Sequence, residues 1–277
     1  MQEPPIHIPL DDLGVVRVHG ADTVRFLQGQ LSNDVTRLTP EHSLLAGYHN
    51  PQGRTIAVLR LIGLSADDVL AVLPRELAPA VAARLSKFVL RSKVKIADES
   101  PAWRVVGVIG PNAAPAVAAA RVDSTRWLTV SPVDSAAPST GERAEWQRLD
   151  IESGQAQVFA ATSEEFVAQM LNLDLLEAIS FDKGCYTGQE VIARAHYRGK
   201  VKRRMQRFIT RTAAELAPGS TGKLADGRPF KVVDAVAREA GRCEFLAVAP
   251  LTHAESESSE SQQIEADPLP LPYSLPD

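Results

Sequence analysis

The stretch FDKGCYTGQEVIARAHYRGKVKRR, from Phe181 to Arg204, sets one of only two cysteines between two glycines, ahead of a basic run. A free thiol has a pKa of about 8.5 and becomes a useful nucleophile or metal ligand when a cation or a helix N-terminus lowers that value. Lys183 is a cation close to Cys185, and the helical pattern after Gly188 would direct free backbone N–H groups toward the thiol. The alternative is that Cys185 is inert packing, because free cysteine is among the residue types most often buried.

The polar residues around this cysteine also allow two interpretations. Glu190 falls in the first turn of the predicted helix, where it would either stabilise the helix or accept a proton. Residues 191–214 include eight Lys or Arg and no Asp or Glu. Such cations bind phosphates or a ligand with several carboxylates, or they simply keep one face of a strand in water. Arg198 and Lys200 flank Gly199 in a predicted turn close to the cysteine, and they are the strongest candidates for ligand binding.

The chain as a whole is typical of a globular protein without a membrane segment. It has 277 residues, 44% hydrophobic and 23% charged, which suits one large domain or two to three small ones. It lacks the run of roughly 20 apolar residues that a membrane helix needs, and its start lacks a secretory signal pattern, so we expect a cytoplasmic protein. Two cysteines exclude a disulfide framework and a Cys-rich zinc site, and the net charge of -4 argues against a general nucleic-acid coat.

Hydrophobic periodicity and turn residues predict an α+β architecture. Strands and helices alternate in the first part, with a short helix after an Asp22 N-cap and two strands joined at the Asn50–Gly53 turn. An Ala-rich helix is expected before Arg121. After residue 200, short runs separated by turn residues predict a small antiparallel barrel. Residues 254–267 are predicted to be a mobile loop, followed by an extended proline-rich tail.

Other sequence patterns that could indicate a catalytic, metal or ligand site are weak. The six histidines show no metal-ligand spacing, and there is no G-x-S-x-G, P-loop or G-x-G-x-x-G motif. Trp146 precedes the segment RLDIESG, where it would either pack in a core or offer a stacking face to a flat heterocycle.

The segment KGCYTGQE, Lys183–Glu190, resembles the signature of the YgfZ folate-binding family, whose members are relatives of the aminomethyltransferase (T-protein) of the glycine cleavage system. Further blocks resemble the same family and extend the similarity over most of the chain: GADTVRFLQGQLSNDVTRL, NPQGRTIAVLRL and PLPLPYSLPD. A motif with a unique cysteine inside several matching blocks is a specific signal.

The resemblance implies a three-domain ring around a central channel, with a ferredoxin-like inserted domain and a C-terminal β-barrel. The expected domains are a discontinuous folate-binding core, an inserted α+β domain, and a small barrel that carries an acidic loop and a proline-rich tail. Their boundaries are 1–43 with 100–199, 44–99, and 200–277, respectively.

The resemblance also implies a folate-binding factor for assembly or repair of [4Fe–4S] proteins, supporting tRNA modification indirectly. Tetrahydrofolate is the implied ligand, and iron–sulfur carriers and [4Fe–4S] enzymes are the implied partners. The functional thiol corresponds to Cys185, which would hold iron or a cluster only transiently and shared with a partner. Two tryptophans line the folate site of a bacterial relative; one corresponds to Trp146 and the other to Leu13, so one stacking wall is lost. The implied catalytic positions are Cys185, Lys183 and Glu190; the implied cofactor-binding positions are Trp146, Leu13, Tyr186, Gln189 and Arg198.

Two other functions stay open at the level of the sequence. A tetrahydrofolate-dependent aminomethyltransferase would need a proton-handling carboxylate beside the folate, and the corresponding block has no acid between Glu41 and Asp67. A direct tRNA-binding module would use the basic run and would lose affinity steeply with salt. The favoured hypothesis is a retained binding scaffold without turnover of the T-protein type.

Overall fold

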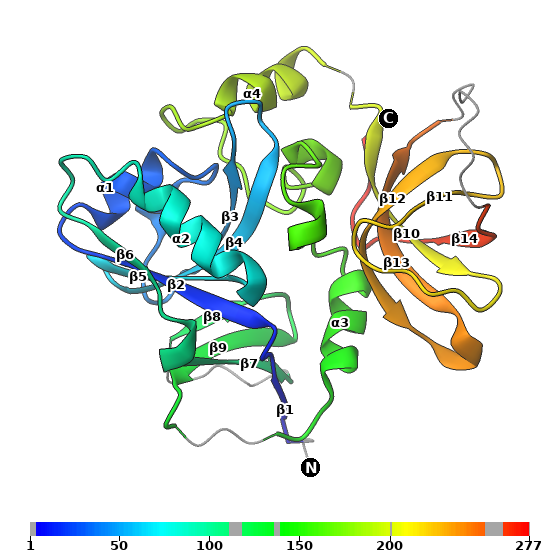
Figure 1. Cartoon of the computed structure of the whole chain (residues 1–277), viewed down its shortest axis with the longest axis horizontal. Helices are drawn as coiled ribbons and strands as arrows, with labels where there is room; N and C mark the ends of the chain where they lie inside the picture. The colour runs from blue at the N-terminus through cyan, green and yellow to red at the C-terminus, as the bar shows by residue number, and fades with distance from the viewer. Residues whose placement is uncertain (1–3, 111–117, 136–138, 200, 253–262, 277) are drawn as a thin grey trace.

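Three sheets built almost entirely from antiparallel pairs, with few helices, form the molecule (Figure 1). The computed structural model describes residues 4–110, 118–135, 139–199, 201–252 and 263–276. The predicted α+β class is confirmed at this level. Short 3-10 turns lie between these elements: η1 (Val35–Arg37), η2 (Arg75–Leu77), η3 (Ser100–Ala102), η4 (Ala160–Thr162), η5 (Ala168–Leu171) and η6 (Glu239–Gly241).

The first sheet has the order β3-β4-β5-β2-β6. The predicted Asn50–Gly53 turn is confirmed: Gly53 N–H donates to Asn50 O at 2.9 Å, and Asn50 Oδ1 accepts from two further backbone N–H groups. β4 and β5 are apolar and almost fully buried, which fixes this sheet as the centre of the largest core. Its strands are β2 (Leu13–His19), β3 (Leu44–His49), β4 (Thr55–Ser65), β5 (Asp68–Pro74) and β6 (Lys95–Asp98).

Two helices accompany this sheet, α1 (Thr23–Gln28) and α2 (Ala78–Ser86). α2 packs on β2 and β6 through buried Val81 and Leu85. Asp22 is the N-cap of α1, but its side chain does not cap the helix. Its Oδ2 instead accepts from Lys93 N–H at 2.7 Å, which attaches the start of α1 to the segment before β6.

The second sheet has the order β1-β7-β9-β8, with β1 (Ile6–Pro9), β7 (Trp103–Ile109), β8 (Ala119–Arg121) and β9 (Arg126–Pro132). The predicted Ala-rich helix is wrong for its described end, because Ala119–Arg121 pairs with β9 as a strand. Burial of Ala120 against the sheet outweighs the helix propensity of alanine, as tertiary packing often does. The residues between Gly110 and Ala118 lie outside the described part of the chain.

The third sheet has the order β11-β12-β13-β10-β14. The predicted closed barrel is not confirmed: a single isolated bridge, between Lys223 and Gln263, joins β11 to the residues before β14. Part of the predicted loop is a strand, because Ala266–Leu269 pairs with β10, while residues 253–262 lie outside the described chain. The strands are β10 (Arg203–Thr210), β11 (Thr221–Lys223), β12 (Pro229–Ala237), β13 (Cys243–Pro250) and β14 (Ala266–Leu269).

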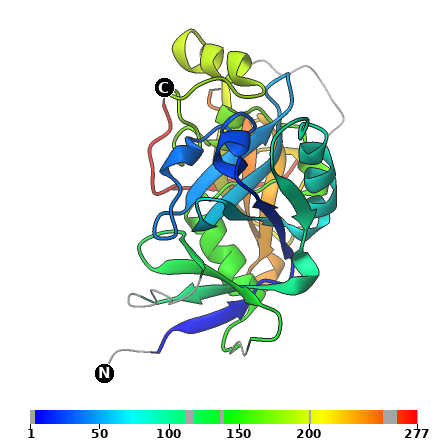
Figure 2. The same ribbon diagram turned by 90° about the vertical axis from the view of Figure 1, so that its left-hand side faces the viewer.

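Two more helices link the sheets. α3 (Arg143–Glu152) lies between the second and third sheets and packs against β12 and β13 (Figure 1). It ends before Gly154, whose φ of 64° confirms the predicted glycine stop. α4 (Gln189–Tyr197) lies at one end of the molecule, as both views show (Figures 1 and 2).

The pairings place β2 in one sheet with β3–β6, and they do not confirm a separate ferredoxin-like unit. The domain boundaries and the ring with a central channel therefore stay predictions. Within the described ranges, no helix is both long enough and apolar enough to cross a membrane.

Candidate functional site

An inner cavity lies where α3 faces strands of all three sheets. It is narrow, about 60 Å³, and apolar side chains form much of its wall. Leu13 from β2 and Trp146 from α3 both line it, although they are far apart in the chain. The structure thus brings together two of the predicted cofactor-binding positions. The other apolar residues of the wall are Leu45, Val58, Val72, Val122, Leu128, Ala156 and Phe159.

Trp146 is a fixed part of this wall, with only 3% of its surface exposed. A Cβ added to Gly107 would lie 2.3 Å from Trp146 Cε3, so only glycine at position 107 lets the indole approach β7. The guanidinium of Arg126 lies 4.9 Å from the centre of the Trp146 ring. Trp146 thus packs in a core and also lines the cavity, while stacking of its ring on a flat heterocycle stays a prediction.

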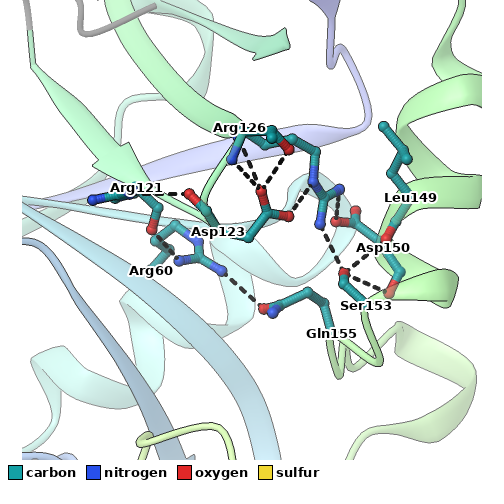
Figure 3. A network of polar contacts seen from close by, with 9 residues as sticks. Arg60, Arg121, Asp123, Arg126, Leu149, Asp150, Ser153 and Gln155 are labelled. Carbon is teal, nitrogen blue, oxygen red and sulfur yellow. Dashed lines mark hydrogen bonds and ion pairs between the residues drawn. The ribbon is translucent and has the colours of Figure 1, made fainter. Parts of the chain in front are cut away.

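Arg126 is held by a buried polar network behind that wall (Figure 3). Its side chain, 1% exposed, donates to Asp123 Oδ2 at 2.6 Å, Asp150 Oδ1 at 2.7 Å and Ser153 Oγ at 2.8 Å. Two carboxylates and a hydroxyl accept the hydrogen bonds of the buried guanidinium. Loss of any one member would leave a buried charged or polar group without a partner. Burial raises the pKa of Asp150, although the Arg126 charge opposes that rise.

Two other carboxylates line the inner cavity. Asp12 forms a bidentate pair with Arg143, with both contacts at 2.7 Å. Asp234 accepts from Gln147 Nε2 at 2.7 Å and from Ala235 N–H at 2.8 Å, with no cation in contact among the described residues. Burial raises the pKa of Asp234 to about 6. The block between Glu41 and Asp67 supplies no acid to this cavity, and the acids that line it come from other segments of the chain.

Arg60 lies at one end of the inner cavity. Its Nη1 donates to Arg121 O and its Nη2 donates to Gln155 Oε1, each at 3.2 Å (Figure 3). Both acceptors are uncharged, and burial lowers the pKa of Arg60 to about 10. Val58 and Arg60 are the residues of β4 that line the inner cavity, so this part of β4 offers a cation and no acid.

An outer cavity of about 650 Å³ continues from this point. The two cavities share Leu45, Arg60, Val122 and Gln155. At its other end the outer cavity reaches Phe181 and His196, whose rings stack at 3.7 Å between centroids. Together the two cavities have a size typical of small-molecule sites.

The loop that carries KGCYTGQE is anchored by Lys183. Its Nζ donates to Leu31 O at 2.7 Å and to Asn33 O at 2.6 Å, and it lies 5.3 Å from the centre of the Tyr186 ring. Burial lowers the pKa of Lys183 to about 8. This ammonium is thus bound to backbone carbonyls, which gives it a structural role in addition to the predicted catalytic one.

Two glycines bring the motif loop against the turn between β3 and β4. Gly188 has a φ of 82° and Gly53 a φ of 71°. A Cβ on Gly188 would lie 2.5 Å from Asn50 O and 3.0 Å from Gly53 Cα. Two of the sequence blocks that carry the family resemblance therefore touch each other directly, and only glycine fits at the contact.

The two cysteines differ sharply in their exposure to solvent. Cys185 is exposed, it lies outside the lining of both cavities, and a Cβ on Gly184 beside it would meet nothing within 4 Å. Cys243 is buried in β13, where burial raises the pKa of its thiol. The described residues contain no group of three or more His, Cys, Asp or Glu placed to hold a metal ion.

The remaining predicted positions lie along the motif loop and α4, apart from the inner cavity. Tyr186 is buried in the largest core, where burial raises its pKa to about 12. Gln189 and Glu190 form the first turn of α4, and Glu190 is exposed. Arg198 is the exposed C-cap of α4, and Lys200 lies outside the described residues.

The charged residues that sequence reasoning missed at or behind the cavities include Arg60, Arg126, Asp150 and Asp234. They belong to no local motif, because strands and a helix far apart in the chain bring them together. Arg60 alone left a signal, since it interrupts the apolar run TIAVLRLIG of β4.

No family model matches the chain. Glycine cleavage system aminomethyltransferase T from Bartonella henselae shares the fold: the two superpose with a TM-score of 0.69 and 15% identity, over 90% of this chain and 79% of that one. A heterotetrameric sarcosine oxidase from Corynebacterium sp. U-96 overlaps 48% of this chain and 77% of that one, with 14% identity and a TM-score of 0.34, too little to define a common fold.

The chain thus belongs to the fold class of aminomethyltransferase T. Within it, the chain belongs to the same family as an uncharacterized protein of Haemophilus influenzae (strain ATCC 51907 / DSM 11121 / KW20 / Rd). The two are 34% identical over 216 residues, which cover 77% of this chain and 76% of that protein.

Proposed function

We propose that this protein binds a reduced folate in the inner cavity and that the thiol of Cys185 acts in the assembly or repair of [4Fe–4S] proteins. One observation carries the proposal: Leu13 and Trp146, the positions that the resemblance assigns to the folate site of a bacterial relative, line one cavity in a fold shared with aminomethyltransferase T. The effect on tRNA modification would be indirect, through iron–sulfur enzymes.

The residues of the inner cavity suit a flat heterocycle with hydrogen-bond donors on its edge. Leu13, Val72 and Leu128 supply apolar walls, and Asp150 and Asp234 supply acceptor oxygens. A pterin ring combines these two requirements. The narrowness of the inner cavity suits the ring alone, so the rest of the ligand would lie in the wider outer cavity.

The thiol would act on a partner at the surface. Cys185 is exposed, whereas Cys243 is buried. A [4Fe–4S] cluster usually needs four ligands, so one thiol would hold it only together with an iron–sulfur carrier or a [4Fe–4S] enzyme. Exposure of Cys185 between Gly184 and Tyr186 supports such a transfer, because neither cavity encloses the sulfur.

A second candidate function is a tetrahydrofolate-dependent aminomethyltransferase. Asp234 favours it, because this carboxylate lines the inner cavity without a cation and its raised pKa suits proton transfer. Formation of methylenetetrahydrofolate from a lipoyl-bound aminomethyl substrate, lost in Asp234→Asn, would support this alternative. No turnover by the native chain would dismiss it.

Folate binding is tested by anaerobic calorimetry with tetrahydrofolate. We expect saturable binding to the native protein and no binding to Val58→Phe, which fills the inner cavity. Equal binding by the native protein and Val58→Phe would refute the inner cavity as the site.

The role of the thiol is tested in cells that lack the protein. Cys185→Ala should accumulate normally but fail to restore the activity of [4Fe–4S] enzymes, whereas Cys243→Ala should restore it. Full restoration by Cys185→Ala would refute the thiol role and leave folate binding untouched.

A further inference from the structure

One exposed side of α4 follows directly on the loop that carries the exposed thiol, at one end of the molecule (Figure 1). Val191 and Arg194 are three residues apart and share this side of the helix, and Arg198 follows one turn later as the C-cap. Tyr197 adjoins them at the same end. We call these four side chains the α4 surface. All four are exposed, and none of them lines the inner or the outer cavity.

Tyr197 is an aromatic side chain held in place on this surface. It is 65% exposed, yet its ring centroid lies 4.8 Å from that of His196 and 6.1 Å from that of Phe181, both in edge-on contacts. Val191 is 40% exposed, and its inner side packs on the turn between β3 and β4, where a Cβ on Gly53 would lie 2.9 Å away. An exposed ring that is already ordered loses little conformational entropy when a partner covers it, which is typical of an interface anchor.

Unpaired positive charge surrounds this aromatic side chain. Four exposed cations of α4 and the start of β10 form no side-chain hydrogen bond or ion pair within the described ranges: Arg194, Arg198, Lys202 and Arg203. Further along β10, by contrast, Arg211 is paired with Asp267 at 2.6 Å. Glu190 is the single acid in the sequence of α4, and it is exposed at the end nearest the thiol. The α4 surface is therefore complementary to an acidic partner.

The mixture of groups favours a protein partner over a nucleic acid. A phosphate backbone is negative along its whole length, so it would meet Glu190 and the exposed Asp182 on the two sides of the thiol. A protein surface can instead place acids against Arg194 and Arg198 and an apolar hollow over Tyr197. The nine residues of α4 span about 14 Å, less than a standard interface of about 800 Å² per partner needs, so we expect a weak and transient contact.

We infer that the α4 surface docks a [4Fe–4S]-carrying protein whose surface beside the cluster is acidic, and that docking brings this cluster to Cys185. The inference rests on the proposed role of the thiol and adds the chemistry of the partner to it. Arg194 and Arg198 orient the partner by charge, and Tyr197 fills a hollow on it. An exposed thiol does not select among partners by itself, so the helix that follows it supplies the selectivity.

The loop after α2 offers a matched control surface. Phe88 and Leu90 are exposed there, at 49% and 88%, and the neighbouring Lys87 and Arg91 are exposed as well. This loop thus combines apolar and cationic side chains as the α4 surface does, but it follows a different helix. Reversing two charges on either surface changes the net charge of the protein by the same amount, so a difference between the two variants reports position and not charge alone.

The experiment compares Arg194→Glu/Arg198→Glu with Lys87→Glu/Arg91→Glu in cells that lack the protein, after thermal unfolding has shown that each folds. One readout is the restored activity of [4Fe–4S] enzymes. The other is photo-crosslinking by p-benzoylphenylalanine in place of Tyr197, with captured proteins identified by mass spectrometry and captured RNA by sequencing. We expect the native surface to capture an acidic iron–sulfur protein. Reversal on α4 should lower capture and restored activity about tenfold, and reversal on the control loop should change both less than about twofold.

The outcomes separate this inference from the proposed function. Full restoration by Arg194→Glu/Arg198→Glu, equal losses in the two double variants, or capture of RNA in place of an acidic iron–sulfur protein overturns the inference, while the role of the thiol stands if Cys185→Ala still fails to restore activity. Full restoration by Cys185→Ala overturns both. If Arg194→Glu/Arg198→Glu does not fold, Arg194→Gln/Arg198→Gln takes its place: a loss of capture of about threefold supports the inference, and unchanged capture overturns it.

Discussion

Two cations removed from solvent, the buried Arg126 behind the inner cavity and the half-buried Lys183 in the motif loop, have their hydrogen bonds satisfied in different ways. Arg126 is neutralised by two carboxylates and a hydroxyl. Lys183 is bound by two backbone carbonyls, and burial lowers its pKa to about 8. The first arrangement fixes side chains around a wall, whereas the second fixes the path of the backbone.

The difference between the two cations corresponds to a difference between their regions: one forms a cavity wall, and the other carries an exposed thiol. The network holds Trp146 still, so that a cavity of constant shape faces a ligand. The motif loop is attached by Lys183 at one end and by Gly188 at the other, and Cys185 between them stays exposed. A rigid pocket and an accessible thiol are thus built by separate means, and substitutions should affect them separately.

The largest effect is expected from Arg126→Met. It leaves Asp123 and Asp150 without their cation and should lower the free energy of unfolding by about 3–5 kcal/mol. Urea unfolding measures this, with Arg148→Met as the control, whose half-exposed pair with Glu152 should contribute less than about 1 kcal/mol. If both variants lost the same small amount, the network would not be the stabilising unit that Figure 3 suggests.

The inner cavity should also impose a pH dependence through Asp234. Its pKa is raised to about 6 in the folded protein from 3.8, so the folded state binds more protons between these values. The contribution of Asp234 to the free energy of unfolding should therefore fall as pH rises from about 4 to 6, by about 2–3 kcal/mol, and Asp234→Asn should lack this fall. Urea unfolding at several pH values, against Asp11→Asn on the surface, measures the difference. Parallel curves for native protein and Asp234→Asn would contradict it.

The sequence predicted most strands and helices because each has a local cause. The apolar runs of β4 and β5, the Asn50–Gly53 turn and the glycine stop after α3 are all readable from neighbours in the chain. It failed at Ala119–Arg121, where pairing with β9 overrides the preference of alanine. A closed C-terminal barrel was also expected, and the strand pairings describe an open order of five strands.

The site was predictable only where a motif or a family resemblance marked it. Leu13, Trp146 and Cys185 came from that resemblance, and no local pattern links the first two to a common cavity. Arg60, Asp150 and Asp234 carry the charge of the cavity, but long-range packing alone brings them together. Lys183 was expected to serve the thiol, and its carbonyl contacts with Leu31 and Asn33 could not be read from its neighbours.

The motif loop offers a matched pair of glycine substitutions. Gly188→Ala places a Cβ 2.5 Å from Asn50 O at a φ of 82° and should cost about 1–2 kcal/mol of unfolding free energy. Gly184→Ala meets no atom within 4 Å and should cost roughly 0.5 kcal/mol or less. Urea unfolding compares them. Equal losses would mean that the loop is not attached through the Gly188–Gly53 contact.

The smallest effect on stability is expected from a change at Cys185, so the quantity measured there is the reactivity of the thiol. Cys185 should react with a small thiol reagent at the rate of a free cysteine, and roughly a thousandfold faster than Cys243, which is buried in β13. Labelling with mass-spectrometric readout measures both rates, and mild urea should accelerate only Cys243. A slow Cys185 would mean that the motif loop covers its sulfur, so that the thiol belongs with the enclosed cavity rather than with the exposed surface.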